Sequence, residues 1–192
     1  MKKLGLLSLL WIVLASLSLV GCEKHGGDFI IEEINNDDVM AYNDNLVDFA
    51  SKCIESENIV WDTYQDESAS IQDIESAIDN TISECTTSKD MVNALWARNW
   101  DSSLKDSVIT VMEKDIEYYS KFKELLPFLD LEELDEEQAA AYDAIIDEIE
   151  LIDNELTQAN SDLIAVQEEF ARNNWFSLEP MDDSEEETYE WI

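Results

Sequence analysis

Three cysteines and one histidine are the side chains with the most reactive chemistry in this chain: Cys22, Cys53, Cys85 and His25. The histidine precedes the predicted helices, so the helical part has none for a Ser-His-Asp triad, a Cys-His pair or a histidine-ligated zinc site. Glu-x-x-His pairs of di-iron bundles, a glycine-rich phosphate loop and a calcium loop of the Asp-x-Asp-x-Asp-Gly type are also absent from the sequence. We therefore expect no enzyme, no cofactor and no metal.

Acidic side chains dominate the charge of the chain. The 46 Asp and Glu stand against 11 Lys and Arg, which gives a formal net charge of -35. A field this negative excludes binding to nucleic-acid phosphates or to an anionic bilayer through charge. Paired carboxylates such as Glu136 and Glu137 carry little information in so acidic a chain, and the only enzyme they leave open is a carboxylate-only hydrolase. Basic proteins or peptides and divalent ions are the allowed partners; alternatively, the acidity serves solubility or reflects a salty habitat.

An apolar seam between Asp135 and Asn173 is the element around which the chain is organised. Nine residues recur there with a mean spacing of 3.5: Tyr142, Ile145, Ile149, Ile152, Leu156, Ala159, Leu163, Val166 and Phe170. This period is typical of one long amphipathic helix packed against other helices. Asp135 and Gln138 are expected to cap its start reciprocally.

Three shorter seams precede the long one. They predict helices over residues 38–64, 71–95 and 102–126, the last ended by Pro127. Thr86, Thr87 and Ser88 are poor helix formers, which leaves open a break in the second helix. Four helical segments joined by short polar turns favour an all-α fold, an antiparallel up-and-down four-helix bundle with a long coiled-coil-like C-terminal helix. The alternative is a three-helix bundle with a helical hairpin.

The amino end combines basic residues, an apolar run and a cysteine. Lys2 and Lys3 precede an uncharged run over residues 4–20, which closes with Leu19, Val20, Gly21 and Cys22. These last four residues resemble the lipobox of bacterial lipoproteins, although Val20 stands where Ala or Ser is commonest. The resemblance covers residues 1–22 and implies cleavage before Cys22 and lipidation of its sulfur and amine, which anchors the chain in a membrane. The alternative is an uncleaved anchor.

The position after the lipidated cysteine bears on the membrane of residence. Lipoproteins retained in the inner membrane typically carry Asp there, whereas this chain has Glu23. The resemblance therefore favours the outer membrane, with the protein facing the periplasm. We divide the chain into a signal peptide (1–21), a lipid-anchored tether (22–36), a helical bundle (37–176) and an acidic C-terminal tail (177–192).

Cys53 and Cys85 are predicted to form a disulfide. Both lie on core-facing seams, and the midpoint of their numbers, 69, falls inside the predicted turn between the first two helices. Antiparallel helices therefore bring them opposite each other, and export delivers them to a compartment where disulfides form. The alternative is a pair of free buried thiols.

Charge along the long helix predicts its neighbour. Acidic residues occupy one heptad position beside the seam: Glu148, Glu155, Asp162 and Glu169. Two copies of this helix would repel each other, so we expect a monomer. The third helix is rich in lysine, and a hairpin centred near Leu131 predicts that Lys114 lies close to Glu148.

Tryptophans and acids together favour binding of a cationic partner. Trp96 and Trp100 are four residues apart near the end of the second helix, and aromatic faces and carboxylates both attract cations. The other interpretation of these tryptophans is that they cap the core. We expect a lipid-anchored, acidic interaction module that binds a basic protein or peptide, through residues including Trp96, Trp100, Glu148 and Glu155. The alternative is a structural or spacer lipoprotein without a specific ligand.

Overall fold

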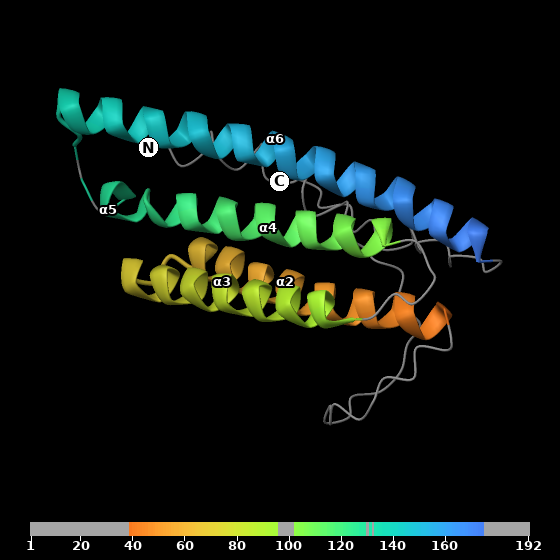
Figure 1. Cartoon of the computed structure of the whole chain (residues 1–192). Helices are drawn as coiled ribbons and strands as arrows, with labels where there is room; N and C mark the ends of the chain where they lie inside the picture. Colours follow the sequence, from red (N-terminus) through yellow and green to blue (C-terminus); the bar gives the residue numbers. More distant parts are fainter. Residues whose placement is uncertain (1–38, 96–101, 130, 132, 175–192) are drawn as a thin grey trace, which may run out of the picture.

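The protein is an all-α, antiparallel four-helix bundle (Figure 1). The computed structural model describes residues 39–95, 102–129, 131 and 133–174. Its helices are α2 (Val39–Gln65), α3 (Ile71–Ala94), α4 (Ser103–Lys123), the short α5 (Leu126–Leu129) and α6 (Glu136–Asn173), and this described part contains no strand. The expected bundle is therefore confirmed. The predicted signal peptide, tether, Trp96, Trp100 and acidic tail lie outside the described residues.

The four long helices follow one another around the bundle. In Figure 1, α4 lies between α6 and α3, and α2 lies beside α3. Side chains then link α2 to α6, since the rings of Tyr42 and Phe170 lie 5.9 Å apart. Gln167 Nε2 donates to Asn43 Oδ1 at 3.3 Å. These contacts complete a four-helix arrangement in place of the three-helix alternative.

The helix starts follow the capping chemistry expected of their residues. Asp135 accepts from the Gln138 backbone N–H at 2.8 Å, and the Gln138 side chain accepts from the Asp135 N–H at 3.1 Å. Ser70 and Asp73 form the same reciprocal capping box at the start of α3. Each box satisfies backbone donors that no helical carbonyl can reach.

Helix α3 runs unbroken through its weak middle. The hydroxyls of Thr86 and Thr87 donate to the carbonyls of Ile82 and Ser83, each four residues earlier. These polar side chains therefore bond to their own helix instead of ending it. The alternative of a break at residues 86–88 is wrong.

The connection between α4 and α6 is longer than predicted. Helix α4 ends at Lys123, and Pro127 is the second residue of α5, where a missing N–H removes no helical hydrogen bond. The prediction that Pro127 itself ends the third helix is thus wrong. Leu125 and Leu126 are buried and fix this turn on the bundle.

The longer connection shifts the pairing of α4 with α6 by one heptad. Lys114 pairs with Glu155 rather than with the predicted Glu148, which instead lies 2.7 Å from Lys121. Both pairs are centred near residues 134–135, not near Leu131. The choice of α4 as the neighbour of α6 was correct, and the predicted register was wrong. None of the described helices is long and apolar enough to cross a membrane.

Candidate functional site in the middle of the bundle

The apolar core of the bundle is divided into two clusters. One cluster gathers Tyr42 to Ala50 of α2 with Leu104 to Met112 of α4, and the other gathers Val60 with Tyr118 to Leu126. Between them lies a buried layer of polar residues and sulfur, called here the middle layer. Its members are Cys53, Ser56, Glu57, Thr81, Cys85, Ser88, Asp115 and Asn160.

A disulfide crosses the middle layer between α2 and α3. Cys53 and Cys85 are bonded, their Cα atoms lie 4.5 Å apart, and the side chains are 1% and 0% exposed. The predicted pairing is confirmed. A hydrogen bond joins the same two helices, because the Thr81 hydroxyl of α3 donates to the Ser56 backbone carbonyl of α2 at 2.8 Å. Neither sulfur is open to exchange with thiols in solution.

Two carboxyl groups lie beside the disulfide without a cation. One hydrogen bond joins them, in which the Glu57 O–H donates to the Asp115 carboxyl, and it raises the pKa of Glu57 and lowers that of Asp115. None of the described lysines or arginines forms an ion pair with either residue. Burial raises the pKa of Asp115 from 3.8 to about 7. Burial, the charge of Asp115 and the hydrogen bond to it also raise the pKa of Glu57 well above 4.5, so the pair holds protons that exposed carboxyls release.

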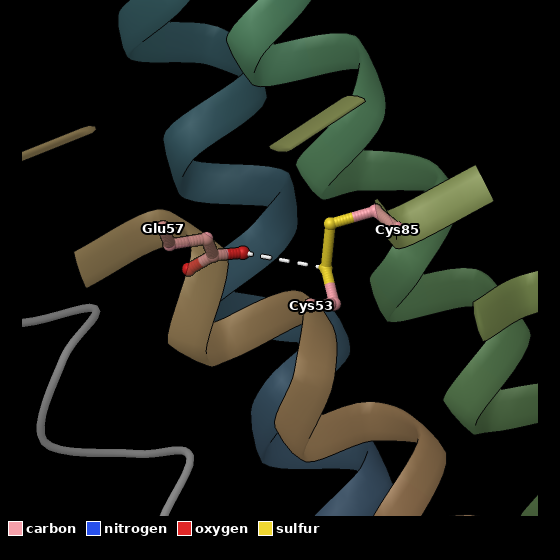
Figure 2. A group of neighbouring side chains, drawn as sticks. All are labelled: Cys53, Glu57 and Cys85. Carbon is pink, nitrogen blue, oxygen red and sulfur yellow. Dashed lines mark hydrogen bonds between the residues drawn. A yellow bond between two sulfur atoms is a disulfide. The ribbon is translucent and has the colours of Figure 1, made fainter. Parts of the chain in front are cut away.

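The sulfur contacts agree with protonated carboxyls. Glu57 Oε1 lies 3.7 Å from Cys53 Sγ, the contact dashed in Figure 2, and Asp115 Oδ2 lies 3.9 Å from the same atom. A disulfide sulfur carries no hydrogen and can only accept one. Any hydrogen bond along these contacts must therefore come from a carboxyl O–H.

Further polar atoms of the middle layer lack partners among the described residues. They are Asp115 Oδ1 and both amide atoms of Asn160, which is 1% exposed. A small cavity of about 10 Å³ lies between α2, α4 and α6 beside Cys53 and Asp115, enough for about one water molecule. Unpaired buried polar atoms cost stability. The middle layer therefore favours the folded state less than apolar packing would.

The basic residues of the described helices are concentrated on α4. Four lysines form ion pairs between helices, and each pair includes a residue of α4: Lys89 with Glu113, Lys114 with Glu155, Lys121 with Glu148, and Lys123 with Glu75 and Asp79. Lys105 Nζ donates to the Asn93 and Leu95 carbonyls at the end of α3. The lysine side chains therefore link α4 to α3 and to α6.

Helix α6 presents an acidic outer face. It carries eleven acidic residues against one basic residue, Arg172. Asp147 on this face makes no ion pair within the described part of the chain, and Leu151, one turn later, is 60% exposed. We call Asp147, Glu148, Leu151 and Glu155 the Leu151 patch. The two predicted partner-binding acids in it, Glu148 and Glu155, remain about half exposed while they pair with lysines of α4.

Two aromatic residues outside the predicted partner site also have clear positions. Trp61 and Tyr64 of α2 contact Phe122, with ring centroids 5.6 Å and 5.8 Å away. They cover the end of the second core cluster. This arrangement is core packing rather than an exposed aromatic surface.

Comparison with known proteins adds no family or fold relative. The sequence matches no protein-family model, and neither a curated protein nor a solved structure is similar to it. The functional argument therefore rests on the residues and their geometry.

Proposed function

We propose that this protein is a lipid-anchored, acidic helical module of the bacterial cell envelope that binds a basic protein or peptide. The observation that carries the proposal is the separation of charge within the bundle. The lysines form ion pairs where α4 contacts α3 and α6. The outer face of α6, a helix of 38 residues and about 57 Å, is acidic. A long negative surface attracts a cationic partner and repels nucleic acid and anionic lipid.

The Leu151 patch is the proposed centre of the contact. An exposed leucine supplies apolar area, and the surrounding carboxylates accept hydrogen bonds from lysine or arginine. A basic amphipathic segment has the complementary arrangement, with apolar residues on one side and cations beside them. Trp96 and Trp100, and the roles of inhibitor, immunity-type neutraliser or adaptor, belong to the same proposal.

A capture experiment with matched variants tests the site. The full chain in mild detergent is fixed to beads, exposed to envelope extract and eluted with a step of salt. Asp147→Lys with Leu151→Ala alters the patch. Glu84→Lys with Ile59→Ala makes a matched charge reversal and a matched truncation at exposed positions of α3 and α2. We expect a basic protein on the wild type and the control variant, and at least about tenfold less on the patch variant.

Two results would contradict the proposed binding. If nothing basic is retained, the alternative of a spacer lipoprotein without a ligand becomes the better account. If both variants lose the partner equally, overall charge acts without a defined site at Leu151.

The membrane anchor is proposed separately, from the lipobox-like residues Leu19 to Cys22. Cys22→Ser removes the only sulfur at which a lipid thioether would form there. We expect the variant to lose incorporation of a labelled fatty acid and to leave the membrane fraction. Equal labelling of wild type and variant would argue against lipidation at this cysteine.

A further inference from the structure

The middle layer gathers the ligand types of a transition-metal site. Cys53 Sγ, Cys85 Sγ and a carboxylate oxygen of Glu57 all lie within 4.8 Å of one another, and all three residues are buried (Figure 2). Two ligands of one zinc ion lie at most about 4.6 Å apart, twice a Zn–S bond of about 2.3 Å. The three side chains therefore lie together at the scale of a metal site, although the two sulfurs are bonded to each other in this structure.

We propose that the chain with Cys53 and Cys85 as thiols binds one thiophilic divalent cation, with Zn²⁺ the best fit, through both sulfurs and Glu57. Asp115 is a positioning residue that hydrogen-bonds the ligating carboxylate, and a water molecule takes the fourth position. Zinc accepts both thiolate and carboxylate ligands, and three protein ligands with one water are an established coordination of zinc. This site is independent of the proposed binding of a basic partner.

The same two thiols can bind the metal or form the disulfide, but they cannot do both at once. Binding of the cation releases the two thiol protons and the Glu57 proton, so a neutral cluster ends with a charge of -1. Forming the disulfide instead transfers two electrons and two protons to a disulfide donor, which becomes a dithiol. A newly made chain carries thiols, so metal uptake requires no reductant.

The carboxyls are the reason to prefer a metal site over a purely structural disulfide. A disulfide needs no acidic neighbours, whereas Glu57 and Asp115 are 4% and 2% exposed with no described basic residue paired to them. Asp115 Oδ1 also has no hydrogen-bond partner among the described residues. A divalent cation takes the place of the protons that Glu57 and the two thiols hold, and a hydrogen bond to the ligating carboxylate is typical of the shell around a metal.

The surroundings allow the sulfurs to separate. In a tetrahedral site with bonds of about 2.3 Å, two sulfurs lie about 3.8 Å apart. Small side chains, Ser56 and Thr81, lie at the same helix crossing. The cavity of about 10 Å³ beside Cys53 gives further room on the side of α4 and α6.

Cobalt absorption tests the proposal, because Co²⁺ bound to thiolate gives charge-transfer and visible bands that carboxylates alone do not. The full chain is used in detergent with Cys22→Ser, so that only Cys53 and Cys85 supply sulfur. It is unfolded in denaturant, reduced and freed of reductant, and then titrated with Co²⁺ and Zn²⁺ both during refolding and after it. We expect one thiolate-bound cobalt per reduced chain, displaced by zinc, and none in the oxidised chain.

Variants separate the buried site from the acidic surface. Glu57→Gln replaces the carboxyl ligand by an uncharged amide of the same shape. Circular dichroism and thiol counting check that the fold and the disulfide are retained. The cobalt affinity of this variant should fall at least about tenfold, whereas Asp90→Asn on the surface of α3 should leave it unchanged. The absence of a thiolate band in the reduced chain under both conditions overturns the proposal. Equal binding by the oxidised chain, or by Glu57→Gln, overturns it as well.

Discussion

Glu57 of α2 and Asp115 of α4 hydrogen-bond to each other in the core, with only 4% and 2% of their surfaces exposed. Two carboxyls can lie this close in a buried layer because they hold protons that water-exposed acids would release. The layer therefore contributes less to the free energy of unfolding than apolar side chains would, and its contribution depends on pH.

Stability of the bundle should fall as pH rises from about 4 to about 7. The pKa values of Asp115 and Glu57 are raised in the folded state, so the folded chain keeps protons that the unfolded chain has lost. Their stabilising contribution is therefore complete below the unfolded pKa values and is lost as pH passes through the folded ones. The urea midpoint measured across this range checks the direction. A midpoint that rises with pH would contradict it.

Asp115→Asn should stabilise the protein at neutral pH. The raised pKa, from 3.8 to about 7, corresponds to as much as about 4 kcal/mol, because each unit is about 1.4 kcal/mol. The amide keeps the shape without the charge, so the variant should also show a flatter pH dependence of unfolding. Asp90→Asn, an exposed control on α3, also relieves repulsion in the acidic chain but should shift stability by less than about 0.5 kcal/mol. Equal effects of the two variants would show that general repulsion, not burial, sets the pH dependence.

The disulfide should contribute about 3 to 4 kcal/mol by restricting the unfolded chain. Cys53 and Cys85 are 32 positions apart, and closing that loop removes unfolded conformations. Comparison of urea unfolding with and without reductant, in metal-free buffer with chelator, measures the contribution. The oxidised chain, denatured, should expose no thiol from either cysteine. Titration of two thiols at these positions would mean that the bond does not form.

Between α4 and α6, only the ion pairs of the observed register should show favourable energetic coupling. A double-mutant cycle on Lys114 and Glu155 should give about 0.2 to 1 kcal/mol of favourable coupling, reduced by salt, because the pair is exposed. The same cycle on Lys114 and Glu148 should give almost none. The opposite ranking would restore the register centred near Leu131.

The long helices were predictable from sequence because their burial follows a simple period. The nine seam residues of α6, from Tyr142 to Phe170, are all buried or partly buried, and the Asp135–Gln138 cap formed as expected. Pairing of Cys53 with Cys85 followed from the same periodicity, because two antiparallel seams and one turn fix which residues meet. The shifted ion pairs show the limit, since the length of a helical connection depends on tertiary packing around Leu125 and Pro127.

The buried acids of the middle layer were missed because they occupy core positions that hydrophobicity patterns assign to apolar residues. Asp115 lies three residues after Met112 and four before Tyr119, which is core spacing, and Glu57 lies four after Cys53 and three before Val60. An acid at such a position was the available signal. In a chain with 46 acidic residues, that signal is difficult to separate from an exposed carboxylate.

Binding to the captured basic protein at two ionic strengths is the most direct measurement of the proposed function. Calorimetric titration would compare the full chain in detergent with the patch variant, Asp147→Lys with Leu151→Ala, and the control variant, Glu84→Lys with Ile59→Ala. We predict that the wild-type affinity falls at least about tenfold from low to high salt, and that the patch variant alone is weakened at low salt by a similar factor. An affinity unchanged by salt, or equal losses in both variants, would contradict the account.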